Sequence, residues 1–334
     1  MRHQRWRSLR GCGSAYQTGE IRVPGTFRSL VSLVTLSTAM ACLLLTQTSF
    51  ACEDDPVMNG LGNTTYTGIE DEPVTLSSGH WEGTPYTQNS ASRPRVGLLK
   101  DMYLTGDLDA DGQEETVAIL WQSSAGTGSY TYLAVMKPRD DEFENISTAL
   151  VGDRVKLRDG RIDSGVIYLD VLQAGDDDPM CCPTQLATRS WAMTGTQLEE
   201  SEIEVTGILS LDVLEGSDWR LSRLDGEQAM IEDAEVTLSF ADGQISGKSA
   251  CNRYSADISE QDKPGEMRIG PTMGTRMACP DHLMELESLY LKALGQVTSF
   301  SFHAGQLVLN GLNDDGKPFS MFFVSVGSGP RIEL

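Results

Sequence analysis

Acidic residues alternate along one short segment of the chain, residues 106–115, which reads G-D-L-D-A-D-G-Q-E-E. Its candidate metal ligands are four carboxylates, those of Asp107, Asp109, Asp111 and Glu115. Ca²⁺ takes several oxygen ligands from a flexible loop, and a glycine such as Gly112 suits the sharp turn. An EF-hand loop would need an acid where Ala118 stands, so a shorter loop closed by Glu115 is required. The pattern predicts a structural Ca²⁺ site; the alternative is a solvated acidic turn in front of a strand.

Two cysteines stand in short segments of the C-terminal third, S-G-K-S-A-C-N-R-Y (residues 246–254) and T-R-M-A-C-P (residues 275–280). Their simplest use is a disulfide between Cys251 and Cys279 that ties a strand to the start of a helix. A bridge over a loop of this length contributes up to about 3 kcal/mol. The alternative is a redox-active pair, which is disfavoured because the C-x-x-C motif is absent.

The first 51 residues have the pattern of an export signal. They hold six arginines and one acid, and residues 29–51 are apolar or small and carry no charge. A basic region followed by an apolar region and a small residue is typical of a secretory signal. Cleavage before Cys52 would leave the N-terminal cysteine that carries the acyl chains of bacterial lipoproteins, so we predict lipid attachment there. Ordinary signal cleavage and an uncleaved anchor are the alternatives, since about 20 apolar residues can span a bilayer.

The number of cysteines favours the lipid. Five follow the predicted leader, and an odd thiol in an oxidising compartment needs an explanation. If Cys52 carries lipid, the other four can pair. Adjacent Cys181 and Cys182 leave three alternatives open: a vicinal disulfide, pairing elsewhere, or a soft-metal site. Zinc is disfavoured there because no histidine lies nearby and structural zinc needs about four N or S ligands.

The net charge of −22 limits the class of partner. Such a surface repels nucleic acid and favours cations or basic partners, although it also serves solubility. The sequence contains no G-x-S-x-G or H-E-x-x-H motif and no glycine-rich phosphate loop. We therefore expect a protein that is not an enzyme; the alternative is a site assembled from scattered carboxylates.

Three parts follow the leader: an acidic tether at 52–64, a β-rich domain at 65–205 and a second domain at 216–326. The β-branched and aromatic content predicts strands at 115–121, 130–136 and 166–172, the first two joined as a hairpin. In the second domain, turns such as Asp242-Gly243 between apolar runs predict further hairpins. Apolar spacing over residues 281–297 predicts one helix. Antiparallel strands with one main helix predict the α+β class.

At these residues the C-terminal part resembles the META domain, a family found in bacterial heat-shock lipoproteins and their relatives. The resemblance runs from residue 218 to about 323. It rests on these positions: Trp219, the turn 241–244, Ser246-Gly247, Cys251-Asn252-Arg253-Tyr254, Thr275-Arg276-Met277-Ala278-Cys279, and Glu285 or Glu287. The family usually has glycine where this chain has Ala250. The resemblance implies an envelope location, a link to stress or antibiotic tolerance, and no established catalytic residues.

Upstream segments resemble a domain that is often joined to META domains in bacterial lipoproteins. They are residues 106–115, G-D-R-V at 152–155 and D-P-M-C-C-P-T at 178–184. The activity of that domain is unknown, so this resemblance supports an architecture and no mechanism.

Charged residues near the cysteine pair, Arg253, Arg276 and Glu285, predict a polar cluster. Such a cluster can bind a ligand. The alternative is an ion-pair network that orients loops, because charge clusters often serve structure.

Together these features predict an exported, lipid-anchored envelope protein that acts as a non-catalytic binding or structural module, with a role in stress or antibiotic tolerance. Its expected partners are the membrane, through the N-terminal lipid, and an unidentified envelope protein or small ligand. We expect it to face the periplasm, with the outer membrane favoured, or to be secreted. The alternative is a Ca²⁺-stabilised periplasmic or secreted protein for binding or adhesion.

Overall fold

The computed structural model describes residues 4–5, 55–87, 92–124, 126, 128–140, 142–179, 182–224 and 234–326. Apart from strand β1 (Gln4–Arg5), the predicted leader, Cys52 and Cys181 lie outside these ranges. Among the described residues, no helix has both the length and the apolar character needed to cross a membrane.

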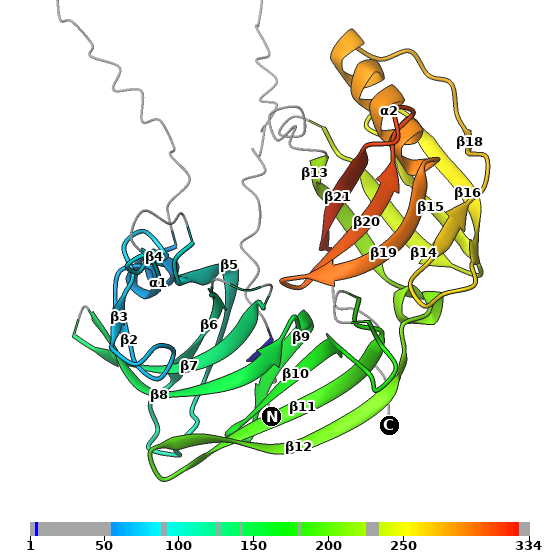
Figure 1. The fold of residues 1–334 in the computed structure, drawn as a ribbon. Helices are drawn as coiled ribbons and strands as arrows, with labels where there is room; N and C mark the ends of the chain where they lie inside the picture. Colours follow the sequence, from blue (N-terminus) through cyan, green and yellow to red (C-terminus); the bar gives the residue numbers. More distant parts are fainter. Residues whose placement is uncertain are drawn as a thin grey trace, which may run out of the picture.

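Two β-rich units follow one another along the chain (Figure 1). The elements of the first unit are α1 (Pro56–Leu61), β2 (Thr65–Tyr66), β3 (Val74–Thr75), β4 (His80–Glu82), β5 (Arg95–Gly106), β6 (Glu115–Ser123), β7 (Tyr130–Arg139), β8 (Glu142–Asp153), β9 (Lys156–Asp163), β10 (Val166–Gln173), β11 (Gln185–Thr194) and β12 (Gln197–Ile208). They form two antiparallel five-stranded sheets, ordered β4-β5-β6-β7-β8 and β1-β9-β10-β11-β12, beside a small β2-β3 pair. The predicted hairpin of residues 115–121 and 130–136 is confirmed by the pairing of β6 with β7.

Strand β6 lies between two hydrophobic cores, which explains why its apolar run is almost continuous. Val117 and Ile119 face the core shared with the second sheet, whereas Ala118 and Leu120 face the core under α1, β2 and β3. Successive side chains of a strand point to opposite faces, so burial on both faces requires an unbroken apolar sequence.

Within the predicted tether at 52–64, the described residues 55–64 include a short packed helix, α1. Asp55 caps α1 through a hydrogen bond from the Val57 N–H (2.9 Å), and Pro56 occupies the first turn, where a proline is tolerated. Leu61 is fully buried, and its carbonyl accepts a hydrogen bond from the Tyr66 hydroxyl (2.8 Å). Burial of this apolar residue holds the segment against the first sheet.

A short 3-10 helix, η1 (Leu211–Leu214), leads into the second unit. The elements of this unit are β13 (Asp218–Leu224), β14 (Thr237–Ala241), β15 (Gln244–Lys248), β16 (Arg253–Glu260), β17 (Met267–Ile269), β18 (Met273–Gly274), α2 (Asp281–Leu294), β19 (Val297–His303), β20 (Gln306–Leu312) and β21 (Pro318–Ser325). The sheet order is β17-β16-β15-β14-β13-β21-β20-β19, with β18 paired to β16. A bridge between Glu266 and Ser299 brings the two ends of this sheet together.

The main helix, α2, packs on this sheet through one face. Leu286, Tyr290 and Leu294 are buried in the core of the second unit, as the apolar spacing predicts. The fold is therefore mostly antiparallel β with one main helix, which agrees with the expected class in its main features. The Asp242-Gly243 hairpin is also present, between β14 and β15.

The two units share an interface. Leu172 and Leu186 of the first unit are buried in the core of the second. The Gly305 N–H donates to the Leu157 carbonyl (3.0 Å), and the Arg158 guanidinium lies 5.0 Å from the centre of the Phe302 ring. This docking joins residues that are far apart in the sequence.

Candidate functional site

The acidic turn joins β5 to β6. Gly112 adopts a φ of +89°, a left-handed conformation that favours glycine. Glu115 begins β6 and is fully buried, with its side chain directed back under the turn. The turn forms one wall of a cavity of about 540 Å³, whose lining includes Asp107, Ile162 and Met193.

Each of the four carboxylates uses one oxygen to accept a backbone N–H of the same turn. The pairs are Leu108 N to Glu115 Oε2 (2.9 Å), Asp111 N to Asp109 Oδ1 (3.1 Å), Gly112 N to Asp107 Oδ2 (3.1 Å) and Gln113 N to Asp111 Oδ1 (2.8 Å). These bonds fix the turn and leave one further oxygen on each acid.

Three of the predicted ligands lie together. Asp107, Asp109 and Glu115 offer oxygens that all lie within 4.8 Å of one another, a spacing compatible with one shared cation. Asp111 is not part of that group; its second oxygen lies 2.5 Å from the Lys137 Nζ atom. The donor set is all oxygen, which is the chemistry that Ca²⁺ prefers.

Lys137 is the residue of this cluster that the sequence analysis missed. Its Nζ atom also lies 3.0 Å from Asp109 and 3.5 Å from the buried Glu115. Thr116 pairs with Met136 across β6 and β7, so Lys137 lies beside Glu115. The sequence analysis predicted the hairpin of β6 and β7 but not its register. That register decides which residue of β7 lies beside Glu115 and the acidic turn.

The ion pair between Lys137 and Asp111 shifts the pKa of each group in the direction that favours its charged form. The hydrogen bond from Lys137 is the main cause that lowers the pKa of Asp111, with the Gln113 N–H as a second cause. The hydrogen bonds to Asp111 and Asp109 raise the pKa of Lys137 above its ordinary value.

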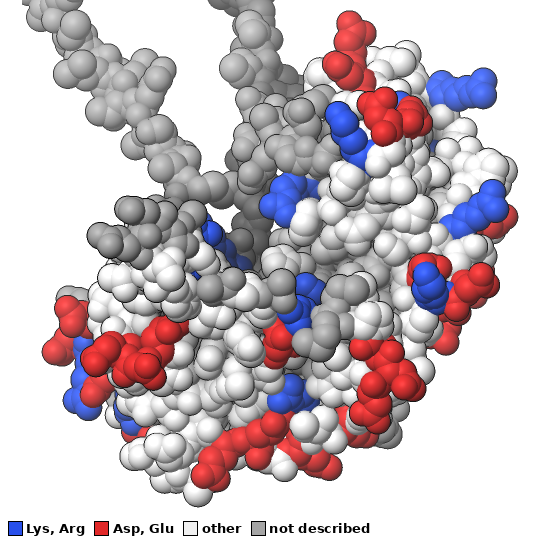
Figure 2. All heavy atoms as spheres, viewed as in Figure 1, with Lys and Arg blue, Asp and Glu red and all other residues white. Residues whose placement is uncertain are grey.

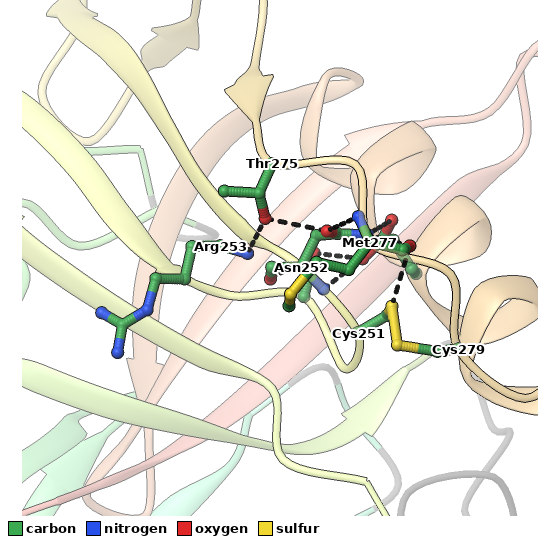
Figure 3. The surroundings of a disulfide bond; sticks show 8 residues. Cys251, Asn252, Arg253, Thr275, Met277 and Cys279 are labelled. Carbon is green, nitrogen blue, oxygen red and sulfur yellow. Dashed lines mark hydrogen bonds between the residues drawn. A yellow bond between two sulfur atoms is a disulfide. The ribbon is translucent and has the colours of Figure 1, made fainter.

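The second candidate site surrounds the cysteine pair (Figure 3). Cys251 and Cys279 form the predicted disulfide, with their Cα atoms 6.0 Å apart. Cys251 lies in the turn before β16, and Cys279 lies just before Pro280, the N-cap residue of α2. The disulfide therefore joins that turn to the start of the helix. Upstream of this turn, Gly247 passes so close to β14 that an added Cβ atom would lie 2.0 Å from the Thr237 carbonyl oxygen.

Asn252 connects three segments around this disulfide. Its backbone N–H and side-chain Nδ2 donate to the Glu287 carboxylate of α2 (2.7 and 3.0 Å). Its Oδ1 accepts from the Thr275 hydroxyl (2.8 Å) and the Met277 N–H (2.7 Å). Ser249 also donates to Glu287 (2.7 Å). The network ties the cysteine turn to α2 and to the segment after β18, so its evident role is to hold loops in place.

Glu287 is charged in this network. Burial alone would raise its pKa, but hydrogen bonds from Ser249, from Asn252 and from the Cys251 N–H together lower the pKa below its ordinary value. The negative charge is thus matched by donors that the turn supplies.

The predicted polar cluster of Arg253, Arg276 and Glu285 is not assembled as ion pairs. All three residues are exposed, and no ion pair joins them in the part of the chain that the structure describes. Figure 3 shows the Arg253 guanidinium directed away from the disulfide. Glu287 is the acid that reaches the turn, because it flanks the buried face of α2.

Ala250 is held in a conformation that favours glycine, with a φ of +77°, and is almost fully buried. A left-handed L-residue costs roughly 1–2 kcal/mol. We expect Ala250→Val to lower the free energy of unfolding by about 2 kcal/mol, since its branched Cβ adds crowding. Ala250→Gly should change it by less than about 1 kcal/mol, because relief of strain is offset by chain entropy. Urea unfolding of both variants is the measurement, and equal stabilities would contradict it.

An open edge strand offers a third surface. Among the described strands, β12 has one neighbour in its sheet, β11, and most residues of β12 are exposed. Figure 2 shows acidic side chains along the lower edge of the molecule, over β12. Glu199, Glu202 and Glu204 are exposed beside Ile203 and Val205. Charged side chains on an edge strand discourage pairing with like copies.

Cys182 is disulfide-bonded. Cys181 and Cys52 lie outside the described residues, so the open alternatives for Cys181 and the predicted lipid attachment stay predictions.

Comparison with known proteins identifies the C-terminal part only. The META domain family model matches residues 212–322. A solved structure described as the NMR structure of the protein from Burkholderia xenovorans is 25% identical, covers 35% of this chain and 86% of its own, and has a TM-score of 0.29. No curated protein matches this chain. The disulfide, the turn that precedes it and the single main helix thus lie within a segment of known family, and residues 212–322 of this chain are a META domain.

Proposed function

We propose that this chain is an exported envelope protein, anchored by lipid on Cys52, in which two β-rich units act as a non-catalytic binding or structural module. The observation that carries the proposal is the disulfide between Cys251 and Cys279 inside the META domain. Structural disulfides persist in oxidising compartments such as the bacterial periplasm. The basic and apolar pattern of residues 1–51 supports the same location.

The anchor is tested on protein purified from native membranes. We expect mass spectrometry of the N-terminal peptide to show Cys52 as the first residue, with acyl chains attached. A Cys52→Ser variant should leave the membrane fraction, because loss of the acyl chains removes the apolar contact with the bilayer. A free amine at an unmodified Cys52 would contradict the lipid.

A role in stress or antibiotic tolerance is the finer part of this proposal, and the META domain supports it. The test is a deletion strain complemented with the wild-type gene or with Cys52→Ser, scored for survival under heat and under antibiotics. Full tolerance without the gene would rule out this role. For a protein partner, the acidic edge strand β12 favours a basic segment.

A second candidate function is a periplasmic or secreted binding protein whose first unit is stabilised by Ca²⁺. It is favoured by the oxygens of Asp107, Asp109 and Glu115 within 4.8 Å of one another. If Ca²⁺ binds the folded state only, it raises the melting temperature as its concentration increases. Asp109→Asn should abolish this shift.

The matched control is Asp314→Asn, which alters an exposed acidic turn of the META domain whose acid pairs with Lys292. We expect this variant to keep the full Ca²⁺ effect. An unchanged melting temperature of the wild-type protein in Ca²⁺ would exclude the second candidate.

A further inference from the structure

The acidic turn keeps four carboxylate oxygens after its backbone hydrogen bonds are made. They are Asp107 Oδ1, Asp109 Oδ2, Asp111 Oδ2 and Glu115 Oε1. Two of them accept hydrogen bonds from Lys137 Nζ, at 3.0 Å for Asp109 and 2.5 Å for Asp111. The other two, on Asp107 and Glu115, are buried and have no hydrogen-bond partner among the residues that the structure describes.

Glu115 points to a ligand more directly than the exposed acids do. Its side chain is fully buried, and among the described residues its Oε1 has no hydrogen-bond partner, the Lys137 ammonium lying 3.5 Å away. A buried charged oxygen without a hydrogen bond is costly, so native proteins rarely keep one without a compensating cation. By contrast, the turn at Asp314 is exposed and its acid is paired, as expected for a solvated turn.

The charge of the cluster also exceeds what Lys137 supplies. The Lys137 ammonium, with three N–H donors and one positive charge, lies within ion-pair distance of three carboxylates, those of Asp109, Asp111 and Glu115. Asp107 adds a fourth carboxylate to the cluster. A divalent ion brings twice that charge and accepts about six to eight oxygens. Lys137 and a divalent ion cannot occupy the same position, because both require the second oxygens of Asp109 and Glu115.

We propose that the turn between β5 and β6 is a Ca²⁺ site for which Lys137 is the built-in competitor. The Lys137 ammonium offsets part of the negative charge of the turn when Ca²⁺ is absent, and Ca²⁺ binds by displacing it. Lys137 therefore sets the affinity of the site. This inference rests on the second proposed function, in which Ca²⁺ stabilises the first unit.

Competition of this kind favours weak binding. Extracellular Ca²⁺ modules bind at about 10⁻⁴ to 10⁻³ M, where the ion is abundant. A site that loses its own counter-ion on binding suits that range, because each binding event must break the ion-pair contacts of Lys137 with Asp109 and Glu115.

The test is equilibrium dialysis of the purified protein against Ca²⁺ for the wild type, Lys137→Met and Lys137→Arg. Lys137→Met keeps the stem and removes the charge, and we expect it to bind Ca²⁺ at least about tenfold tighter. Lys137→Arg keeps the charge and should bind no tighter than the wild type. Adding Asp109→Asn to Lys137→Met should remove the gain, whereas adding Asp314→Asn should not.

The outcomes separate this inference from the second proposed function. Binding to Lys137→Met but not to the wild type would show that Lys137 blocks the site, which overturns its displacement by Ca²⁺ and refutes Ca²⁺ stabilisation of the natural protein. Equal binding by both refutes the competition and leaves Ca²⁺ stabilisation intact. Absence of binding to either protein overturns both.

A measurement on the wild type avoids reliance on the folding of the variants. Lys137 is 22% exposed and held by its ion pairs, so its reaction with an amine-acetylating reagent should be slow. At saturating Ca²⁺ we expect its acetylation, read by mass spectrometry, to increase several-fold, while that of Lys292, which pairs with Asp314, stays unchanged. Equal reactivity of Lys137 with and without Ca²⁺ would overturn the proposal.

Discussion

Replacing both Cys251 and Cys279 by alanine is expected to lower the free energy of unfolding by about 2–4 kcal/mol. The two residues are 28 positions apart in the sequence. Without the bond, the unfolded chain regains the freedom of the loop that contains β16, β17 and β18. Cys251 is also buried, so its replacement adds a small packing loss.

Calorimetry with and without a reductant checks this prediction. Cys182 is disulfide-bonded as well, so a reductant has more than one target. The double variant lacks the Cys251–Cys279 bond, so any stability that it still loses in reductant comes from the disulfide of Cys182. We expect the wild type to lose clearly more stability on reduction than the double variant does. Equal losses would mean that this disulfide contributes little.

Asn252→Ala should cost about 2–4 kcal/mol of unfolding free energy, because it removes several hydrogen bonds of a part-buried network at once. The Met277 N–H loses its acceptor, and Glu287 loses the Nδ2 donor. Asn252 is itself almost fully buried, so water cannot easily replace these bonds. The matched control is Asn310→Ala on β20, whose side chain accepts one hydrogen bond, from Ser320. A loss of similar size in the control would contradict a special role of Asn252.

The pH dependence of stability tests the same network through Glu287. Its pKa is lowered in the folded protein, so the charged form stabilises the fold at any pH above the unfolded value, about 4.3. This contribution is lost as the pH falls below that value and through the lowered folded pKa. Glu287→Gln should therefore be less stable than the wild type at pH 7, and the difference should shrink below about pH 4. A difference that is the same at pH 7 and pH 3 would contradict the assignment.

Much of the local structure followed from the sequence alone. Three local features could be predicted because each depends on residues that are close together in the chain. They are the Asp242-Gly243 turn, the strands at 115–121 and 130–136, and the amphipathic spacing of α2. The Cys251–Cys279 pair was also predicted correctly, since few cysteines were available to the C-terminal part. The three acids that meet, Asp107, Asp109 and Glu115, lie on one turn and needed no distant contact.

Tertiary structure decided what depends on contacts between distant segments. Only the register of β6 with β7 places Lys137 against the acidic turn, and only the packing of α2 selects Glu287 in place of Glu285. The burial of Leu61, which turns part of the predicted tether into a packed helix, depends on a sheet formed later in the chain. Periodicity and spacing in a sequence describe one element at a time. Which elements bury one another depends on three-dimensional packing, and that packing decides the partner of each charge.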